Sequence, residues 1–149
     1  MLPGELENYL HSHIPLSHAM QVAVVAIDPD SITLSAPLAP NINHRDTVFG
    51  GSASAVAILA AWSFLNTRLN NANFRSRLVI QRNAMEYTHP IAGEFTACAT
   101  LQNPGQWEEF LRTLARRGKA RITVVTVIEF EGRAAGHFEG EFVALETQS

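Results

Sequence analysis

The amino-acid sequence predicts an α+β fold in which an antiparallel β-sheet wraps around one long central helix. Residues 52–69 are apolar on nearly every face, and a helix with that pattern must be buried. Runs rich in β-branched residues lie on both sides of this segment, in pairs separated by turn residues. Antiparallel strands packed against one such helix form an α+β layer arrangement.

A short helix and a hairpin precede the central helix. Residues 3–18 carry apolar side chains at helical spacing, and Pro15 disfavours a helical conformation at the residue before it. Two strand-like runs follow at residues 21–28 and 31–38, and the Pro-Asp pair between them is typical of a turn. We therefore expect one amphipathic helix followed by a two-stranded hairpin.

Strand-like runs also follow the central helix, at residues 77–89, 93–102, 119–130 and 133–145. Residues 106–117 place apolar side chains at helical spacing, and Gly118 is expected to end this short helix. The last two runs meet at a Glu-Gly pair, which predicts a closing hairpin. This order of elements fits the architecture known as the hotdog fold.

The composition is that of a globular chain and excludes several classes of protein. The 149 residues have the length of one ordinary domain, and a net charge of -3 gives no reason to expect a nucleic-acid partner. Cys98 is the only cysteine, so no intrachain disulfide can form and we expect a cytoplasmic protein. We expect neither a secretory signal nor a membrane span, because the apolar run at residues 53–65 is shorter than the roughly 20 residues required.

Four runs carry a resemblance to a known family: PLAPNINHRDTVFGGSASAVAILAAW, IQRNAMEYTHPI, RRGKARITV and GHFEGEFVAL. They resemble the YiiD C-terminal-type thioesterases, a branch of the hotdog thioesterase superfamily. The most specific residues of the resemblance are Asn41, Asn43, His44, Thr47 and residues 49–52. The resemblance implies a hotdog fold, a homodimer or a dimer of dimers, and hydrolysis of an acyl thioester carried on coenzyme A or acyl carrier protein, in fatty acid metabolism, without a cofactor.

The chain departs from better-understood hotdog thioesterases at two places. Many of those proteins carry a histidine directly before the two glycines, where this chain has Phe49. Several also carry a catalytic Asp or Glu on the central helix, and residues 52–69 contain neither. The acid or base of the reaction is therefore expected outside the central helix.

The loop before the central helix carries the candidate catalytic residues. Free amides at a helix amino terminus stabilise negative charge, and Gly50 and Gly51 let a thioester carbonyl approach the backbone closely. Asp46 or His44 is the candidate base that acts on water. Asn43 is a candidate for orienting the water or the carbonyl. The flanking Phe49 and Ser52 are candidate substrate-binding residues.

Each of these residues also has a structural interpretation. A Gly-Gly pair before a helix is often a tight turn that permits close packing. Asp46 is also typical of a turn or a helix cap, and Asn43 of a residue that holds a loop. His44 is also interpretable as a loop histidine bonded to the backbone.

A basic run predicts where the carrier binds. Five of the eleven Lys and Arg residues are Arg112, Arg116, Arg117, Lys119 and Arg121. Arginine forms paired hydrogen bonds with phosphate and carboxylate groups. We therefore expect this run to bind coenzyme A phosphates or an acidic carrier protein, chiefly through Arg116, Arg117 and Lys119. The alternative is a solvated helix end.

Other reactive side chains are interpreted as structural. His11, His13 and His18 match no structural zinc pattern and are expected at a solvated helix edge. Cys98 lies in an alternating strand and is expected in the core. Glu86 is expected on a solvated strand face, and the alternative is that it reaches the site of a neighbouring chain.

The sequence leaves two alternatives to hydrolysis. A hotdog hydratase or dehydratase also needs an acid and a histidine beside an acyl tunnel, and His44 and Asp46 fit that requirement too. A non-catalytic protein that binds acyl thioesters is compatible with a central helix that carries no carboxylate.

Overall fold

The computed structural model describes residues 1–147, and its elements follow the predicted order. The helices are α1 (Pro3–His13), α2 (Pro15–Ala19), α3 (Gly50–Asn71) and α4 (Trp107–Arg117). The strands are β1 (Ala23–Asp28), β2 (Ser31–Ala36), β3 (Ser76–Tyr87), β4 (Phe95–Leu101), β5 (Lys119–Phe130) and β6 (Arg133–Glu146). Short 3-10 helices occupy Ala39–Asn41 and Pro104–Gln106.

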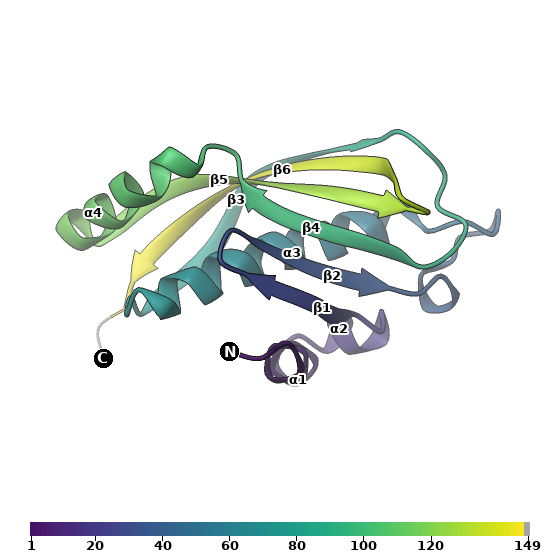
Figure 1. Ribbon diagram of the computed structural model, residues 1–149, viewed down its shortest axis with the longest axis horizontal. Coiled ribbons are helices and arrows are strands. Elements are labelled where there is room, and N and C mark those ends of the chain that lie inside the picture. The colour runs from purple at the N-terminus through teal and green to yellow at the C-terminus, as the bar shows by residue number, and fades with distance from the viewer. Residues whose placement is uncertain (148–149) are drawn as a thin grey trace.

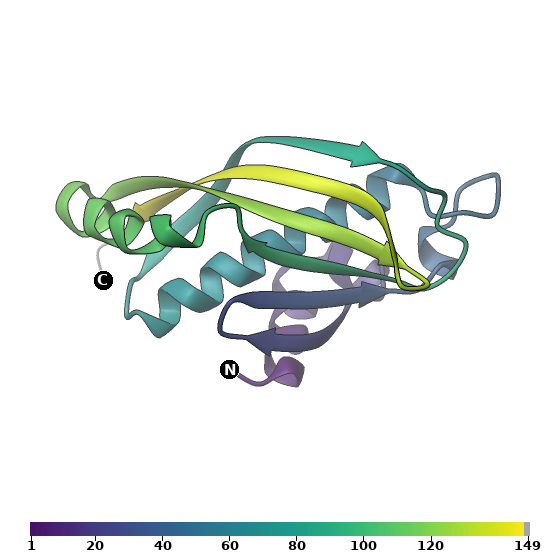
Figure 2. The same ribbon diagram turned by 45° about the horizontal axis from the view of Figure 1, so that its top comes forward.

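The six strands form one antiparallel sheet in the order β1-β2-β4-β5-β6-β3. The sheet curves over α3, which runs along its inner face (Figures 1 and 2). The predicted α+β arrangement around one central helix is therefore confirmed.

Helix α3 fills the concave side of the sheet because its apolar side chains face the strands in several directions. Phe64 and Leu65 are almost completely buried, and small residues such as Ala57 and Ala60 bring the helix backbone close to the sheet. The hydroxyl of Thr126 on β5 donates a hydrogen bond of 3.1 Å to the carbonyl of Ala57. Helix and sheet are thus joined by a polar contact inside the core.

The amino-terminal segment corrects one prediction. A single helix through residue 18 was expected, but the chain leaves the helical conformation at Ile14, whose φ is -124° and ψ is 86°. Pro15 then begins α2, because proline lacks the N–H that a first helical residue does not need.

Two predicted chain reversals are confirmed by backbone geometry. Gly118 has a φ of 70° and ends α4 in the left-handed conformation. Glu131 and Gly132 both have positive φ, 52° and 77°, which is the geometry of a two-residue hairpin turn between β5 and β6.

The two edge strands have different surroundings. Strand β1 lies beside α1, where Glu7 Oε1 accepts a hydrogen bond of 2.9 Å from the N–H of Val24. Strand β3 pairs with β6 along one side only, and most of its residues are exposed. A bulge at Gln81, between Ile80 and Arg82, interrupts its alternation.

Candidate active site

The amino terminus of α3 presents two free backbone N–H groups. The N–H groups of Ser52 and Ala53 bond to the carbonyl of Phe49 at 2.9 and 3.1 Å. Within residues 1–147, the N–H groups of Gly50 and Gly51 have no hydrogen-bond acceptor. Such groups, together with the helix dipole, favour negative charge at this point.

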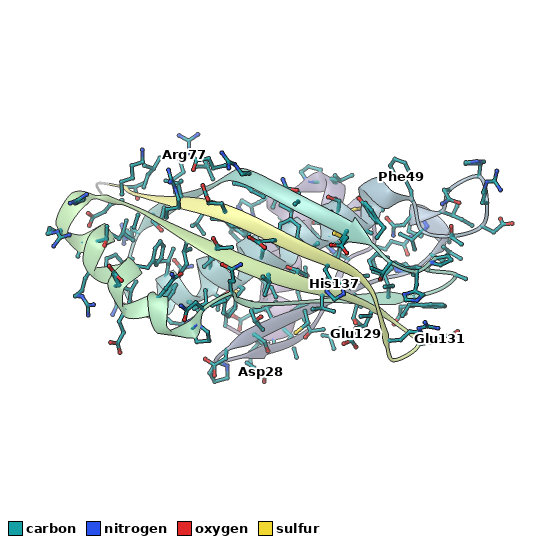
Figure 3. The ribbon with its side chains drawn as sticks, turned by 90° about the horizontal axis from the view of Figure 1, so that it is seen from above. Asp28, Phe49, Arg77, Glu129, Glu131 and His137 are labelled. Atoms are coloured by element: carbon teal, nitrogen blue, oxygen red, sulfur yellow. The ribbon has the colours of Figure 1, made fainter. Side chains whose placement is uncertain are left out.

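The ring of Phe49 lies against the first turn of α3. A Cβ atom built on Gly51 would lie 2.3 Å from Cε2 of this ring, so glycine is required at position 51 while the ring keeps its place. Phe49 nevertheless remains 58% exposed and projects from the molecule beyond the end of β3 (Figure 3). An apolar ring therefore stands uncovered beside the free amides.

Tyr87 ties the end of β3 to the same helix turn. Its hydroxyl donates a hydrogen bond of 3.0 Å to the carbonyl of Gly50. A hollow of about 370 Å³ lies here, lined by Tyr87, Gly50 and the segment that follows the strand. His89 also lines it, with Nδ1 3.2 Å from the carbonyl of Ala134 and Nε2 accepting a hydrogen bond of 2.8 Å from Arg133.

An apolar groove begins one helical turn beyond the free amides. Its walls come from α3, from β3 and from the junction of α1 and α2, and it encloses about 350 Å³. The lining side chains are Ile14, Leu16, Met20, Ala55, Ile58, Leu59, Trp62, Leu78, Ile80 and Phe142.

The groove and the free amides share one face of α3. Ala55, Ile58 and Trp62 follow Gly51 at i+4, i+7 and i+11, which are positions on one side of a helix. An extended apolar ligand that lies along these three residues would therefore point one of its ends toward the N–H groups of Gly50 and Gly51. The arrangement combines an apolar channel with hydrogen-bond donors at one end of it.

The loop before α3 is a small hairpin closed by a bridge between Ile42 and Val48. Asn43 holds it together, since its Nδ2 donates to Thr47 Oγ1 at 2.9 Å and its Oδ1 accepts from the N–H of Arg45 at 2.8 Å. The side-chain amide of Asn43 is thus used within the loop.

His44 and Asp46 lie at the exposed tip of this hairpin. Asp46 has a φ of 63°, in the left-handed region. The loop projects from the end of the molecule (Figure 2). Within the part of the chain that the structure describes, no side-chain hydrogen bond engages His44 or Asp46, and none links them to Gly50 or Gly51.

The basic run lies at the other end of the molecule. Arg116 and Arg117 occupy the last turn of α4 and Lys119 begins β5, far from the loop before α3 (Figure 1). Between these two ends, the guanidinium carbon of Arg68, near the end of α3, lies 4.3 Å from the ring centre of Trp107 at the start of α4. Burial lowers the pKa of Arg68. One chain therefore does not bring the basic run to Gly50 and Gly51.

The remaining residues follow their structural interpretation except Cys98, which was expected in the core but is only half-buried, because it alternates along β4 with the buried Ala97 and Ala99. His11 bonds to the carbonyl of Val22 at 2.7 Å and His13 to that of Tyr9 at 2.9 Å. Among the described residues, no group of three or more His, Cys, Asp or Glu side chains could hold a metal ion. No helix among them is both long and apolar enough to cross a membrane.

Sequence reasoning missed Tyr87 and His89. Both follow from the return of β3 to the amino terminus of α3, a contact between residues far apart in the chain. The only local signal was the polar run YTH at the end of a predicted strand.

The curved antiparallel sheet on one long central helix defines a hotdog-fold protein. Residues 4–146 match the model of the family described as "Putative thioesterase (yiiD_Cterm)", and the chain belongs to this family.

Solved structures agree with this assignment. A protein of unknown function from Chlorobaculum tepidum TLS is 27% identical, with a TM-score of 0.90 over 97% of this chain and 94% of that one. A "putative thioesterase" from Shewanella oneidensis is 25% identical, with a TM-score of 0.85 over 96% of each chain. A thioesterase from Haemophilus influenzae, 13% identical, shares the fold with a TM-score of 0.76 over 100% of this chain and 94% of that one.

Proposed function

We propose that the protein hydrolyses acyl thioesters carried on coenzyme A or acyl carrier protein. The observation that carries this proposal is the apolar groove along α3, which begins one helical turn beyond the free N–H groups of Gly50 and Gly51. A fatty acyl chain fits the groove by its chemistry, and a thioester carbonyl is the group that such donors activate.

In the proposed reaction the acyl chain lies along Ala55, Ile58 and Trp62, and the carbonyl oxygen accepts hydrogen bonds from Gly50 and Gly51. Water attacks the carbonyl carbon and gives a proton to the base. The negative charge that develops on the oxygen faces the two N–H groups and the positive end of the α3 dipole. The tetrahedral intermediate then breaks its carbon–sulfur bond, and the leaving thiolate takes up a proton.

Phe49 and Ser52 border this carbonyl site. The Phe49 ring lies on Gly51, and Ser52 is half-buried in the first turn of α3. In our proposal the ring covers the reacting carbonyl from water, and Ser52 contributes to the wall of the site.

Elimination supports Asp46 as the base. Helix α3 carries no carboxylate, and both ring nitrogens of His89 are already engaged. Glu86 lines a hollow with His137 on the outer face of the sheet, which is the face turned away from α3. Asp46 remains, with His44 as its neighbour at the loop tip, and Asn43 gives the loop the shape that carries both.

The carrier end of the substrate requires cationic groups. Arg116, Arg117 and Lys119 are exposed and form no ion pair within the described residues, so they are free to bind a phosphate or an acidic carrier protein. Their distance from Gly50 within one chain favours an assembly of at least two chains. The open edge of β3 supports a homodimer, or a dimer of dimers built from it.

Thiol release from acyl-CoA substrates of increasing chain length tests the proposal. Asp46→Asn is expected to keep the fold and to lose about 10²- to 10⁴-fold in kcat, which is the usual cost of removing a general base. Asp30→Asn, at the exposed turn between β1 and β2, is the matched control. Activity of Asp46→Asn within about threefold of wild type would move the role of base to His44.

The same assay separates the other candidate functions. A hydratase or dehydratase changes the acyl chain without releasing thiol. A non-catalytic binding protein, which the absence of a carboxylate on α3 favours, binds the thioester and leaves it intact. Acyl-CoA that is bound but recovered unchanged from the wild-type protein would contradict hydrolysis.

A further inference from the structure

The apolar groove along α3 has a far end, about three helical turns beyond the free amides. Along α3 its lining stops at Trp62, and along β3 it stops at Leu78. The next residues on the same sides of the helix and the strand are Asn66, at i+4 from Trp62, and Ser76, at i-2 from Leu78. Both are polar, so the apolar surface that an acyl chain can cover ends at Trp62 and Leu78.

The ring of Trp62 is held in place from the side of α1. The rings of Trp62 and Tyr9 are nearly parallel, at 7°, and their centres are 6.4 Å apart. His13 stacks on Tyr9 in turn, with ring centres 4.1 Å apart, and its Nδ1 lies 2.9 Å from the carbonyl oxygen of Tyr9. Helix α1 is itself anchored in the core by the completely buried Leu10. A fixed aromatic ring therefore stands where the groove ends.

The spacing along α3 sets a length for a bound acyl chain. With a rise of about 1.5 Å per residue, Ile58 lies about 10 Å and Trp62 about 16 Å along the helix from Gly51. Helical side chains lean toward the amino terminus, so the Trp62 ring covers the stretch between these two positions. Zigzag C–C bonds of about 1.5 Å advance an extended chain by about 1.25 Å per carbon. The ring is thus reached after about eight to twelve carbons.

We propose that Trp62 closes the far end of the acyl groove and makes the protein select medium-length acyl chains, of about eight to twelve carbons. This inference rests on the proposed function, since it names the acyl class that the same site takes. A methylene needs about the room of a water molecule, about 30 Å³, so a groove of about 350 Å³ has room for such a chain. A longer chain meets the Trp62 ring or leaves the groove, where further methylenes gain no apolar contact.

The chemistry of the lining narrows the acyl class further. All ten side chains that line the groove are apolar. A hydroxyl group within the groove would lose its hydrogen bonds to water without finding a partner, so the groove favours an unsubstituted hydrocarbon chain. Each methylene that it covers is expected to tighten binding about two- to fourfold.

Binding of a chain-length series tests the limit without requiring turnover. The probes are S-(2-oxoalkyl)-CoA analogues with chains of about four to sixteen carbons, which keep the carbonyl but cannot be hydrolysed. For the wild-type protein, isothermal titration calorimetry is expected to show affinity that rises with each carbon up to about ten and then changes by less than about twofold. A steady rise through sixteen carbons would overturn the limit.

Two substitutions are expected to move the limit in opposite directions. Trp62→Ala opens the far end, so the sixteen-carbon analogue is expected to bind at least about tenfold more tightly, while the affinity for the six-carbon analogue stays unchanged. Ile58→Trp places a ring about one turn nearer the amides and is expected to weaken binding of the ten-carbon analogue at least about tenfold, with the six-carbon analogue much less affected.

Trp107→Ala is the matched control, because it removes the other tryptophan, which is also half-buried but lies on α4. Its chain-length profile is expected to match the wild type. An unchanged profile in Trp62→Ala, or the same change in Trp107→Ala, would overturn the role of Trp62. Thermal melting identifies a variant that fails to fold, and misfolding cannot produce shifts in opposite directions.

Tyr9 acts as a positioning residue for the Trp62 ring. Tyr9→Ala is expected to tighten binding of the sixteen-carbon analogue severalfold and to leave the six-carbon analogue unchanged, because the unsupported ring can turn aside. A uniform loss of affinity at every chain length would overturn this role, since it would show that Tyr9 only stabilises the fold.

Thiol release from acyl-CoA of the same chain lengths separates the two proposals. A length limit that depends on Trp62, without any thiol release, would contradict the proposed function and leave the limit standing. Thiol release with a kcat/KM that still rises at sixteen carbons would overturn the limit and leave hydrolysis standing.

Discussion

Strand β1 at one edge of the sheet lies under a helix, whereas strand β3 at the other edge lies open. At the β1 edge, Glu7 accepts a hydrogen bond from the backbone of Val24, and His11 bonds to the carbonyl of Val22. That strand is also short, six residues, and carries a bulge at Val25. Strand β3 has twelve residues, and beyond β6 no element of the described chain pairs with it.

This difference separates a structural edge from an edge available for binding. Natural proteins protect exposed edge strands with short length, bulges or covering elements, and β1 uses all three. Strand β3 instead borders the apolar groove through Leu78 and Ile80, and it ends at Tyr87 beside the candidate site. The unprotected edge is therefore also the edge that adjoins the proposed chemistry.

The largest expected effect comes from a charge at the open edge. Ile80→Glu would place a carboxylate in the proposed interface twice, once per chain, and is expected to weaken the dimer by about 3 kcal/mol or more, over 100-fold. Val25→Glu adds the same charge to an exposed apolar residue at the covered edge and is expected to leave the assembly unchanged. Light scattering coupled to size-exclusion chromatography measures both. Equal dissociation of the two variants would remove the distinction between the edges.

A smaller effect is expected from loosening the cover of β1. Leu10 on α1 is completely buried, and Leu10→Ala leaves a cavity that is expected to lower the free energy of unfolding by about 2–3 kcal/mol. Leu16→Ala, at an exposed site on α2, is its control and is expected to cost well under 1 kcal/mol. Urea unfolding monitored by circular dichroism compares them. Similar losses would mean that α1 is not held by its buried face.

The smallest effect concerns one hydrogen bond. Glu7→Ala leaves the N–H of Val24 without its acceptor and is expected to lower the free energy of unfolding by about 1 kcal/mol. Glu5→Ala, two residues earlier in α1 and without such a bond, is expected to change the free energy of unfolding by less than half as much. Amide hydrogen exchange at Val24 gives a local measurement. Unchanged protection there in Glu7→Ala would show that α1 covers the edge without this carboxylate.

Features set by neighbouring residues could be predicted from the sequence. The charge-poor stretch gave α3 to within two residues at each end, since burial on several sides leaves no polar face. The end of α4 at Gly118 and the turn at Glu131–Gly132 could also be predicted, because these positions need a positive φ, which glycine adopts readily. Gly50 and Gly51 were expected to offer free amides, and their N–H groups have no acceptor within residues 1–147.

Features set by distant contacts could not be predicted. The neighbouring positions of β3 and β6 depend on the path of the whole chain, so neither the open edge nor the approach of Tyr87 to Gly50 has a local signature. The distance between the basic run and the loop before α3 has the same origin. The exposed position of Asp46 at a hairpin tip could not be predicted either, because a short polar run is compatible with many loop shapes.

The cover of α1 over β1 also limits how far the molecule can assemble through its sheet. A chain with one open sheet edge can pair through its sheet with only one other copy. Pairing through β3 would therefore stop at two copies, because both outer edges of the joined sheet would then be covered β1 strands. If α1 were displaced, each chain would offer two edges, and β1 of one copy could join β3 of the next without closure. The contacts of His11 with Val22 and of Glu7 with Val24 hold α1 in the place where it covers this second edge.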